Sequence, residues 1–216
     1  MKCVKGNKII ELDKTELDQL INDYEETVID LGTGDGRFVY KNASANTKAL
    51  FIGVDTLAVN MAEYSKKARK EKLYNALFVV GSLEILPAEL NCVADRLFII
   101  LPWGTLLQTI VNVSEVGVKT IASLLKPEAN LEIIFGYDQR LEPSESKRLD
   151  LPSEINEHLI KNVIAPAFLN YGKLTLTSTE TLAKTDLENF ESSWSKKIAF
   201  GNERPIYKLT FKNANI

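Results

Sequence analysis

The sequence has few of the residues that build metal centres and disulfide frameworks. Its 216 residues include one histidine and two cysteines, so we expect no metal site and a reducing compartment, the cytoplasm. The single histidine, His158, also argues against a Ser-His-Asp triad. No apolar run approaches the roughly 18 residues of a membrane span, and the segment MKCVKGNKIIELDK lacks the apolar core of a signal peptide. We therefore expect no membrane association.

Positive charge is not in excess either. The 26 lysines and arginines are outnumbered by 29 aspartates and glutamates, which gives a net charge of −3. Indiscriminate nucleic-acid binding normally needs a basic surface, so this balance argues against it but leaves room for a local basic patch. The hydrophobic share of 45% and the charged share of 25% are typical of a globular domain.

Short apolar strands alternate with helices along most of the chain. We expect strands at 27–37, where the strand enters a glycine-rich turn, and at 49–56, 75–82, 95–103, 130–137, 173–183 and 204–214. Helices are expected at 60–73, 114–127 and 155–172, the last with a kink or break near Pro166. This order indicates an α/β, Rossmann-like fold with a seven-stranded, mostly parallel sheet and an antiparallel edge strand. We expect one domain over 1–216, with an N-terminal extension (1–20) and insertions at 138–172 and 184–203.

A glycine-rich loop follows the first expected strand. The segment DLGTGDG, residues 30–36, contains Gly32, Gly34 and Gly36, which let the backbone turn tightly and approach a ligand. Asp55 closes the next strand about 20 residues on, where an acid can bind both hydroxyls of a ribose. The alternative is a glycine turn without a ligand, but the place after a strand and the spacing to Asp55 favour a ligand.

The residues around these glycines favour S-adenosylmethionine over a dinucleotide. A dinucleotide fingerprint is G-x-G-x-x-G, and its helix N-terminus receives a pyrophosphate. This chain has G-x-G-x-G, with the carboxylate of Asp30 two residues before it. That carboxylate would repel a pyrophosphate and attract the ammonium of a methionine moiety. The whole pattern, with Thr33 between the first two glycines, resembles motif I of class I methyltransferases.

Two further loops follow the third and fourth expected strands. Ser82, Leu83 and Glu84 stand where class I methyltransferases contact adenine, although Glu84 fits equally well as an ordinary acid at a helix N-terminus. Leu101-Pro102-Trp103 stands where base-amine methyltransferases carry a motif resembling Asn/Asp-Pro-Pro-Tyr. An aromatic side chain without the polar first residue of that motif indicates stacking on a flat substrate. It also indicates that the target nitrogen belongs to the substrate's ring and not to an exocyclic amine. The alternative is that Trp103 only covers the sheet.

The second tryptophan, Trp194, lies in the connection between the last two expected strands. In this fold that connection returns to the rim carrying Trp103, so the two rings are expected to hold a flipped base, each stack contributing roughly 1–3 kcal/mol. Lys196, Lys197 and Arg204 flank Trp194. A run of charges is usually only a solvated helix face, but the cluster Lys66, Lys67, Arg69, Lys70 and Lys72 adds to a candidate RNA-docking surface.

Five segments together resemble a known family. IDLGTGDGR, IGVD, SKKARK, LPWGTLL and SSWSKKIAFGNER closely resemble the aminoglycoside-resistance methyltransferases of the Kam/Npm group, and the resemblance runs through essentially the whole chain. Those enzymes methylate N1 of adenine 1408 in the A site, in helix 44 of 16S rRNA. The resemblance implies the same reaction here, with S-adenosylmethionine as cofactor, S-adenosylhomocysteine as product, the 30S subunit as partner and aminoglycoside resistance as the consequence. It also implies a monomer.

The resemblance carries specific roles to positions of this chain. It implies cofactor contacts from Asp30, Gly32, Thr33, Gly34, Asp55, Ser82, Leu83, Glu84, Leu101, Thr105 and Ser192. It implies that the target adenine is held and aligned by the catalytic residues Trp103, Trp194 and Pro102. It implies RNA contacts from Lys66, Lys67, Lys70, Arg148, Lys197 and Arg204. At Asn202 and Glu203 the chain departs from the family, which often has a basic residue there, and this departure weakens the expected docking but not the chemistry.

The expected chemistry needs little beyond positioning. N1 of adenine carries a lone pair and requires no strong base, so the protein's task is to align N1 with the sulfonium methyl. Three other functions stay open at this point. One is a tRNA methyltransferase acting on guanine N7, whose members can also carry proline-tryptophan after the fourth strand. The others are a small-molecule methyltransferase and a non-catalytic binder with a vestigial cofactor loop.

Overall fold

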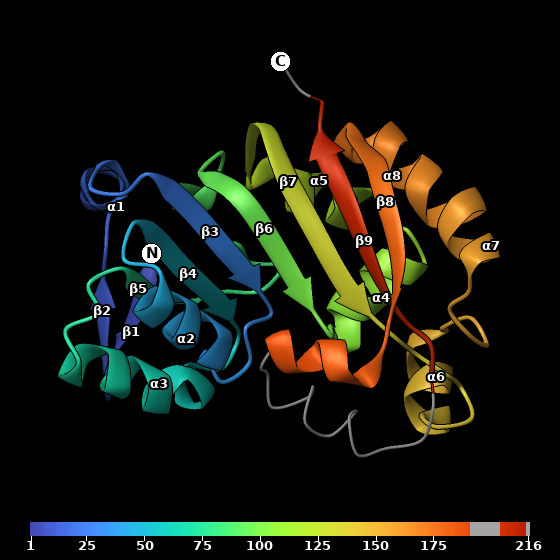
Figure 1. Ribbon diagram of the computed structural model, residues 1–216, viewed down its shortest axis with the longest axis horizontal. Helices are drawn as coiled ribbons and strands as arrows, with labels where there is room; N and C mark the ends of the chain where they lie inside the picture. The colour runs from blue at the N-terminus through green and yellow to red at the C-terminus, as the bar shows by residue number, and fades with distance from the viewer. Residues whose placement is uncertain (191–203, 215–216) are drawn as a thin grey trace.

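The computed structural model describes residues 1–190 and 204–214 of the chain (Figure 1). Its strands are β1 (Lys2–Lys5), β2 (Lys8–Glu11), β3 (Glu26–Leu31), β4 (Ala49–Asp55), β5 (Ala76–Val80), β6 (Ala94–Ile100), β7 (Leu125–Phe135), β8 (Leu174–Leu182) and β9 (Ile206–Asn213). Within the described residues these strands form one nine-stranded sheet in the order β2-β1-β5-β4-β3-β6-β7-β9-β8. The central strands from β5 to β7 are parallel, and antiparallel pairs flank them at both edges.

Helices cover both faces of this sheet. They are α1 (Lys14–Asn22), α2 (Arg37–Ala45), α3 (Ala58–Lys70), η1 (Ala88–Leu90), α4 (Gly104–Val111), α5 (Glu115–Ser123), α6 (Pro143–Leu149), α7 (Glu157–Leu159), the π-helix η2 (Ile160–Ile164), α8 (Ala165–Gly172) and the 3₁₀ helix η3 (Lys184–Asn189). In Figure 1, α2 and α3 lie in front of the sheet, and α4 and α5 lie behind it. Among the described residues no helix is long and apolar enough to cross a membrane.

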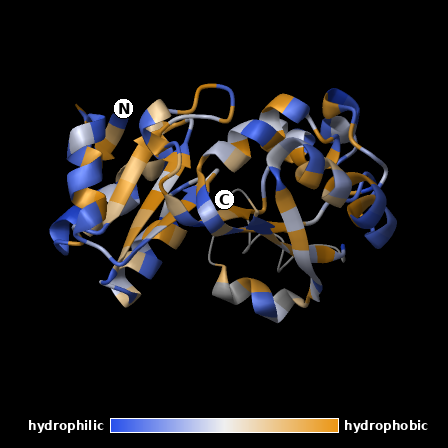
Figure 2. Cartoon of the chain, turned by 90° about the horizontal axis from the view of Figure 1, so that it is seen from above, coloured by the Kyte–Doolittle hydropathy of each residue, from blue (hydrophilic) through white to orange (hydrophobic). Residues whose placement is uncertain are grey.

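The central strands are apolar along their whole length because both of their faces are covered. In β4, Phe51 packs with α2 and α3 in one core cluster, whereas Leu50 and Ile52 pack with α4 and α5 in the other. Such continuous apolar runs are typical of buried parallel strands. Figure 2 shows the same distribution, with hydrophobic residues concentrated in the strands and polar residues on the outer helices.

Two expectations about the elements are wrong in detail, although the α/β methyltransferase class is confirmed. The sheet has more strands than the seven expected, because residues 2–11 form the hairpin β1–β2 and join its edge. The helix expected at 114–127 ends at Ser123, and Pro127 lies inside β7. The pairing of β7 with β6 shifts register opposite Ala94 and Arg96, and a proline without an N–H is tolerated at such an irregularity.

The strand order fixes where a ligand can bind. The chain moves from β3 to β4 and β5 on one side, and β6 then returns to the other side of β3. The loops after the adjacent strands β3 and β6 therefore lead away in opposite directions. This leaves a crevice between them at the carboxyl ends of the two strands.

Candidate functional site

A cavity of about 350 Å³ lies at this switch point. Loops after four parallel strands form it, and it collects most of the residues expected to bind the cofactor or the target base. They are Gly32, Gly34, Asp55, Ser82, Leu83, Glu84, Leu101, Pro102, Trp103 and Thr105.

Asp30 lies near the end of β3 and precedes Leu31, which lines the cavity. Its side chain is 3% exposed, and Thr33 donates its hydroxyl to Oδ2 at 2.6 Å. The other oxygen, Oδ1, is buried and has no hydrogen-bond partner among the described residues. Burial raises the pKa of Asp30 to about 7, and the negative charges of Asp55 and Asp35 add to this effect against the hydrogen bond from Thr33. An ammonium group would provide the missing donor and charge, so the site fits the methionine end of S-adenosylmethionine.

Asp55 ties the glycine-rich loop to the end of β4. Its Oδ2 accepts a hydrogen bond from the N–H of Gly34 at 2.9 Å, and its Oδ1 accepts one from the N–H of Leu57 at 3.1 Å. A carboxylate offers about four lone-pair sites, so both oxygens can still accept from the hydroxyls of a ribose. The backbone bonds fix the direction in which those remaining lone pairs point.

The glycines of the loop have different roles. Gly34 has a φ of +62°, and an added Cβ would meet nothing within 4 Å, so it faces open space in the cavity. Gly36 has a φ of +79°, and an added Cβ would lie 2.5 Å from the ring of Phe78. Gly36 is therefore required by packing, whereas Gly34 leaves room for a ligand.

The loop after β5 joins the loop after β6 through hydrogen bonds. Glu84 accepts hydrogen bonds from Thr105 and Ser82, and these lower its pKa, the bond from Thr105 having the largest effect. Thr105 belongs to the first turn of α4, so Glu84 is more than a solvated acid at a helix N-terminus. Its carboxylate lies on the cavity wall, where the adenine contact was expected.

The turn at Leu101-Pro102-Trp103 has an unusual backbone. Leu101 has a φ of 48°, and its N–H donates to the carbonyl of Ile134 at 2.7 Å. Bulky side chains rarely adopt this left-handed region, and such outliers concentrate at functional sites. Trp103 precedes α4 and packs partly buried against the core while also lining the cavity. The two interpretations of Trp103 are thus compatible, because one ring covers the sheet and also faces the cavity.

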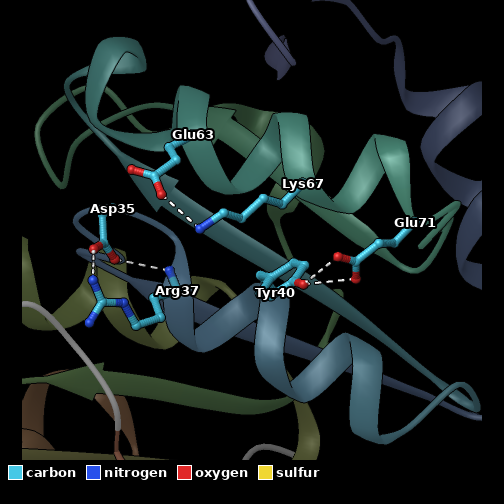
Figure 3. Close-up of polar contacts among 6 residues, drawn as sticks. All are labelled: Asp35, Arg37, Tyr40, Glu63, Lys67 and Glu71. Carbon is cyan, nitrogen blue, oxygen red and sulfur yellow. Dashed lines mark hydrogen bonds and ion pairs between the residues drawn. The ribbon is translucent and has the colours of Figure 1, made fainter.

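The basic residues expected to dock RNA lie on several elements, and some are engaged by acids. Lys66 and Lys70 are exposed on α3. Lys67 lies 2.7 Å from Glu63 and 4.5 Å from the ring centroid of Tyr64, in the polar network between α2 and α3 that Figure 3 shows. The hydrogen bond to Glu63 raises the pKa of Lys67.

The two expected arginines are also paired. Arg148 of α6 forms an ion pair with Glu145 at 2.6 Å. Arg204 forms an ion pair with Glu142, and these side chains are only 10% and 12% exposed. The pair joins the insertion at 138–172 to the residues preceding β9, so Arg204 has a structural role besides the expected contact with RNA. Ser192, Trp194 and Lys197 lie outside the described residues.

Some cavity residues were not predicted from the sequence. Thr56 and Asn60 line the cavity beside Asp55, and Leu106 lines it beside Gly32. The sequence could have indicated these residues, because each follows the end of an expected strand by only a few residues. Among the described residues, no group of three or more metal-binding side chains comes together.

Comparisons with known proteins agree with this geometry. A family model described as NpmA, 16S rRNA (adenine(1408)-N(1))-methyltransferase, matches residues 2–212. A protein of that name from Escherichia coli is 33% identical, over 97% of this chain and 97% of its own. The crystal structure of a 30S ribosomal A1408 methyltransferase from an uncultured bacterium is 42% identical, with a TM-score of 0.79 over 99% of this chain and 100% of that one.

A third relative was solved with a ligand. It is a tryptophan-to-alanine mutant of the 16S rRNA (adenine(1408)-N(1))-methyltransferase from Catenulisporales acidiphilia, with the cosubstrate SAM. It is 28% identical, with a TM-score of 0.87 over 100% of this chain and 97% of that one.

Proposed function

The chain belongs to the family of 16S rRNA (adenine(1408)-N(1))-methyltransferases, and on this premise we propose that it methylates N1 of adenine 1408 in the 30S subunit. The observation that carries the proposal is the cavity at the switch point, which unites the motif of the glycine-rich loop with Trp103. The unpartnered, buried Oδ1 of Asp30 supports S-adenosylmethionine as the cofactor.

The cofactor-binding residues act by orientation. S-adenosylmethionine supplies an electrophilic methyl group on a sulfonium. Asp30 would accept hydrogen bonds from the ammonium, Asp55 would accept them from the ribose hydroxyls, and Glu84 with Ser82 would contact the adenine ring. Gly34 leaves the space into which the methionine end fits. Leu101, Pro102 and Trp103 line the same cavity, so these contacts would hold the cofactor beside the rim that they form.

The target base is held by stacking. Trp103 would present one ring to adenine 1408 and Trp194 the second, and Pro102 would shape the pocket. No side chain at the rim has to remove a proton, because N1 attacks with its lone pair. The protein lowers the barrier by placing N1 in line with the methyl group. The product base carries a positive charge at N1, which interferes with aminoglycoside binding at the A site and causes resistance.

The docking surface completes the proposal. Lys66, Lys67 and Lys70 of α3, with Arg148, Lys197 and Arg204, bind phosphates around helix 44, and the protein acts as a monomer. Because the net charge is −3, docking depends on these local cations rather than on a general attraction to RNA. This dependence favours a folded ribosomal surface over naked RNA as the substrate.

Methylation of purified 30S subunits tests the proposal. We expect label from S-[methyl-³H]adenosylmethionine to enter 16S rRNA, and primer extension to stop at adenine 1408. Trp103→Ala should abolish incorporation while S-adenosylhomocysteine still binds, as measured by calorimetry. Equal activity on naked tRNA, or incorporation into a small molecule but not into 30S subunits, would overturn the proposal in favour of the other two methyltransferase classes.

A further inference from the structure

A second cavity lies at the far end of α3 from the cofactor cavity. It measures about 210 Å³ and lies between α3, the hairpin β1–β2 and β5, with apolar wall residues that include Val4 and Phe78. Asn60 of α3 lines the first cavity and Arg69 lines the second. Ser65 is the α3 residue nearest Asn60 that lines the second cavity, so at roughly 1.5 Å per residue the two linings come within about 8 Å of each other along the helix axis. Figure 1 shows α3 running from the carboxyl end of β4 toward β1 and β2.

The rim of this second cavity is basic. Lys5, Arg69 and Lys72 line it and are exposed, and within the described part of the chain none of them forms an ion pair. Lys5 also lies directly across the hairpin from Lys8, and like charges in that arrangement repel each other. A bound anion would relieve this repulsion, so the charge at the rim is complementary to an anionic partner.

Lys72 occupies a position at which helices usually place glycine. Its φ is 57°, and the N–H of Leu73 donates to the carbonyl of Ala68 at 2.9 Å, closing α3 as a Schellman motif does. Glycine adopts this left-handed conformation without the clash of a Cβ. The chain therefore has a cation where a neutral glycine would give a less strained helix end.

An exposed aromatic ring completes the cavity. Tyr74 lines it and is 75% exposed. Proteins that bind single-stranded RNA combine such rings, on which unpaired bases stack, with cations that bind the flanking phosphates. An acidic peptide would match the cations but would make no comparable use of the ring and the apolar wall.

We propose that this cavity, the hairpin cavity, docks an unpaired nucleotide of the RNA substrate away from the methylated base. Lys5, Arg69 and Lys72 bind its phosphates, and its base lies against Tyr74 and the apolar wall. The inference rests on the proposed function, since the ribosomal RNA is the partner. It extends the RNA contacts proposed for Lys66, Lys67 and Lys70 to the C-terminal end of α3, whereas Asn60 near the other end lines the cofactor cavity, so the helix would set the distance between the docked nucleotide and the flipped adenine.

Two matched glycine substitutions test this inference. Lys72→Gly removes a cation from the hairpin cavity, whereas Lys173→Gly removes one from a left-handed position after α8, where φ is 58°. Both variants should keep or raise the thermal midpoint, because glycine relieves the backbone. The affinity for 30S subunits is then measured with S-adenosylhomocysteine present. Lys72→Gly should weaken it about threefold to tenfold and reduce the slope of log K against log salt by about one, whereas Lys173→Gly should change neither.

A second pair of variants tests the aromatic contact. Tyr74→Ala should weaken 30S binding at least about fivefold, and Tyr171→Ala on α8, where the ring is 37% exposed, should leave it unchanged. Equal affinities for the members of each pair would overturn the inference. So would a concentration-dependent dimer that Tyr74→Ala disrupts, because the cavity would then bind a second copy of the chain.

The two proposals fail in different ways. If the wild-type protein methylates adenine 1408 while Lys72→Gly and Lys173→Gly bind 30S subunits alike, the hairpin cavity is excluded and the proposed function stands. If the wild-type protein binds 30S subunits with the expected dependence on Lys72 but methylates another base, the proposed function fails alone. A wild-type protein that does not bind 30S subunits overturns both.

Discussion

The buried carboxyl group of Asp30 predicts that folding and cofactor binding respond to pH in opposite directions. Burial raises its pKa to about 7 from an ordinary value of 3.8. The folded, unliganded protein therefore binds this proton more tightly than the unfolded chain does. The resulting stability is fully present below about pH 4 and is lost as the pH rises through 7. A pKa difference of about 3 corresponds to about 4 kcal/mol across that window.

Cofactor binding should show the reverse dependence. The ammonium of the ligand favours ionised Asp30, so binding below pH 7 must expel the proton. For a group with a pKa of about 7, affinity for S-adenosylhomocysteine should rise about fivefold between pH 6 and pH 7. Calorimetry at pH 6 in buffers of different ionisation enthalpy should detect the release of nearly one proton per ligand.

Asp30→Asn separates this effect from the other titrating groups. The amide cannot ionise, so the fall in stability attributed to Asp30 between pH 5 and pH 8 should disappear from urea denaturation of the unliganded variant. Its affinity for S-adenosylhomocysteine should drop at least about tenfold, since a hydrogen bond to a charged group is lost. Asp18→Asn, on the exposed side of α1, serves as the control and should keep the wild-type profile. Parallel stability profiles for the wild type and Asp30→Asn would refute the reasoning.

Three further predictions concern other parts of the site. Gly36→Ala should lower the free energy of unfolding, measured by denaturation, by about 2–4 kcal/mol, because the new Cβ meets a phenylalanine ring at a left-handed position. Gly34→Ala should lower it by only about 1 kcal/mol but should weaken cofactor binding, measured by calorimetry. Arg204→Ala should lower the free energy of unfolding by about 3 kcal/mol, because it leaves Glu142 buried without its partner. Trp103→Phe should keep part of the methylation activity that Trp103→Ala loses, measured on 30S subunits, since the smaller ring still stacks.

Much of the lining of the cavity at the switch point was predictable from the sequence because it lies at strand ends. The central strands are apolar on both faces, so their boundaries are visible as continuous runs, and parallel strands bring the residues after them to one edge. Asp55 and Glu84 were placed at this edge in this way and line the cavity, and Asp30 was placed near the end of β3. The unpartnered oxygen of Asp30 could not be predicted, because it depends on which donors the surrounding loop provides.

The hairpin and the ion pairs were harder to predict for different reasons. β1 and β2 have four residues each, too short for the alternation of polar and apolar residues to be distinguished from a loop. The contact between Arg204 and Glu142 joins segments far apart in the sequence and depends on how the insertion folds back. The helix was expected to end at Pro127 because proline commonly ends a helix. That local rule cannot anticipate an irregular strand pairing that tolerates a proline.

The ion pairs also bear on how an acidic protein can bind RNA selectively. Lys67, Arg148 and Arg204 are each engaged by a glutamate, so a phosphate must replace that carboxylate before it gains the full attraction of the cation. Such cations contribute little to random encounters with RNA and more to a surface that matches their geometry. Among the described residues, Lys5, Arg69 and Lys72 at the hairpin cavity form no ion pair and have no such requirement. Lys66 and Lys70 of α3 are exposed and likewise form no ion pair in the described part of the chain. Initial, salt-sensitive attraction should therefore concentrate at the hairpin cavity and the neighbouring half of α3, and discrimination should concentrate at the paired residues.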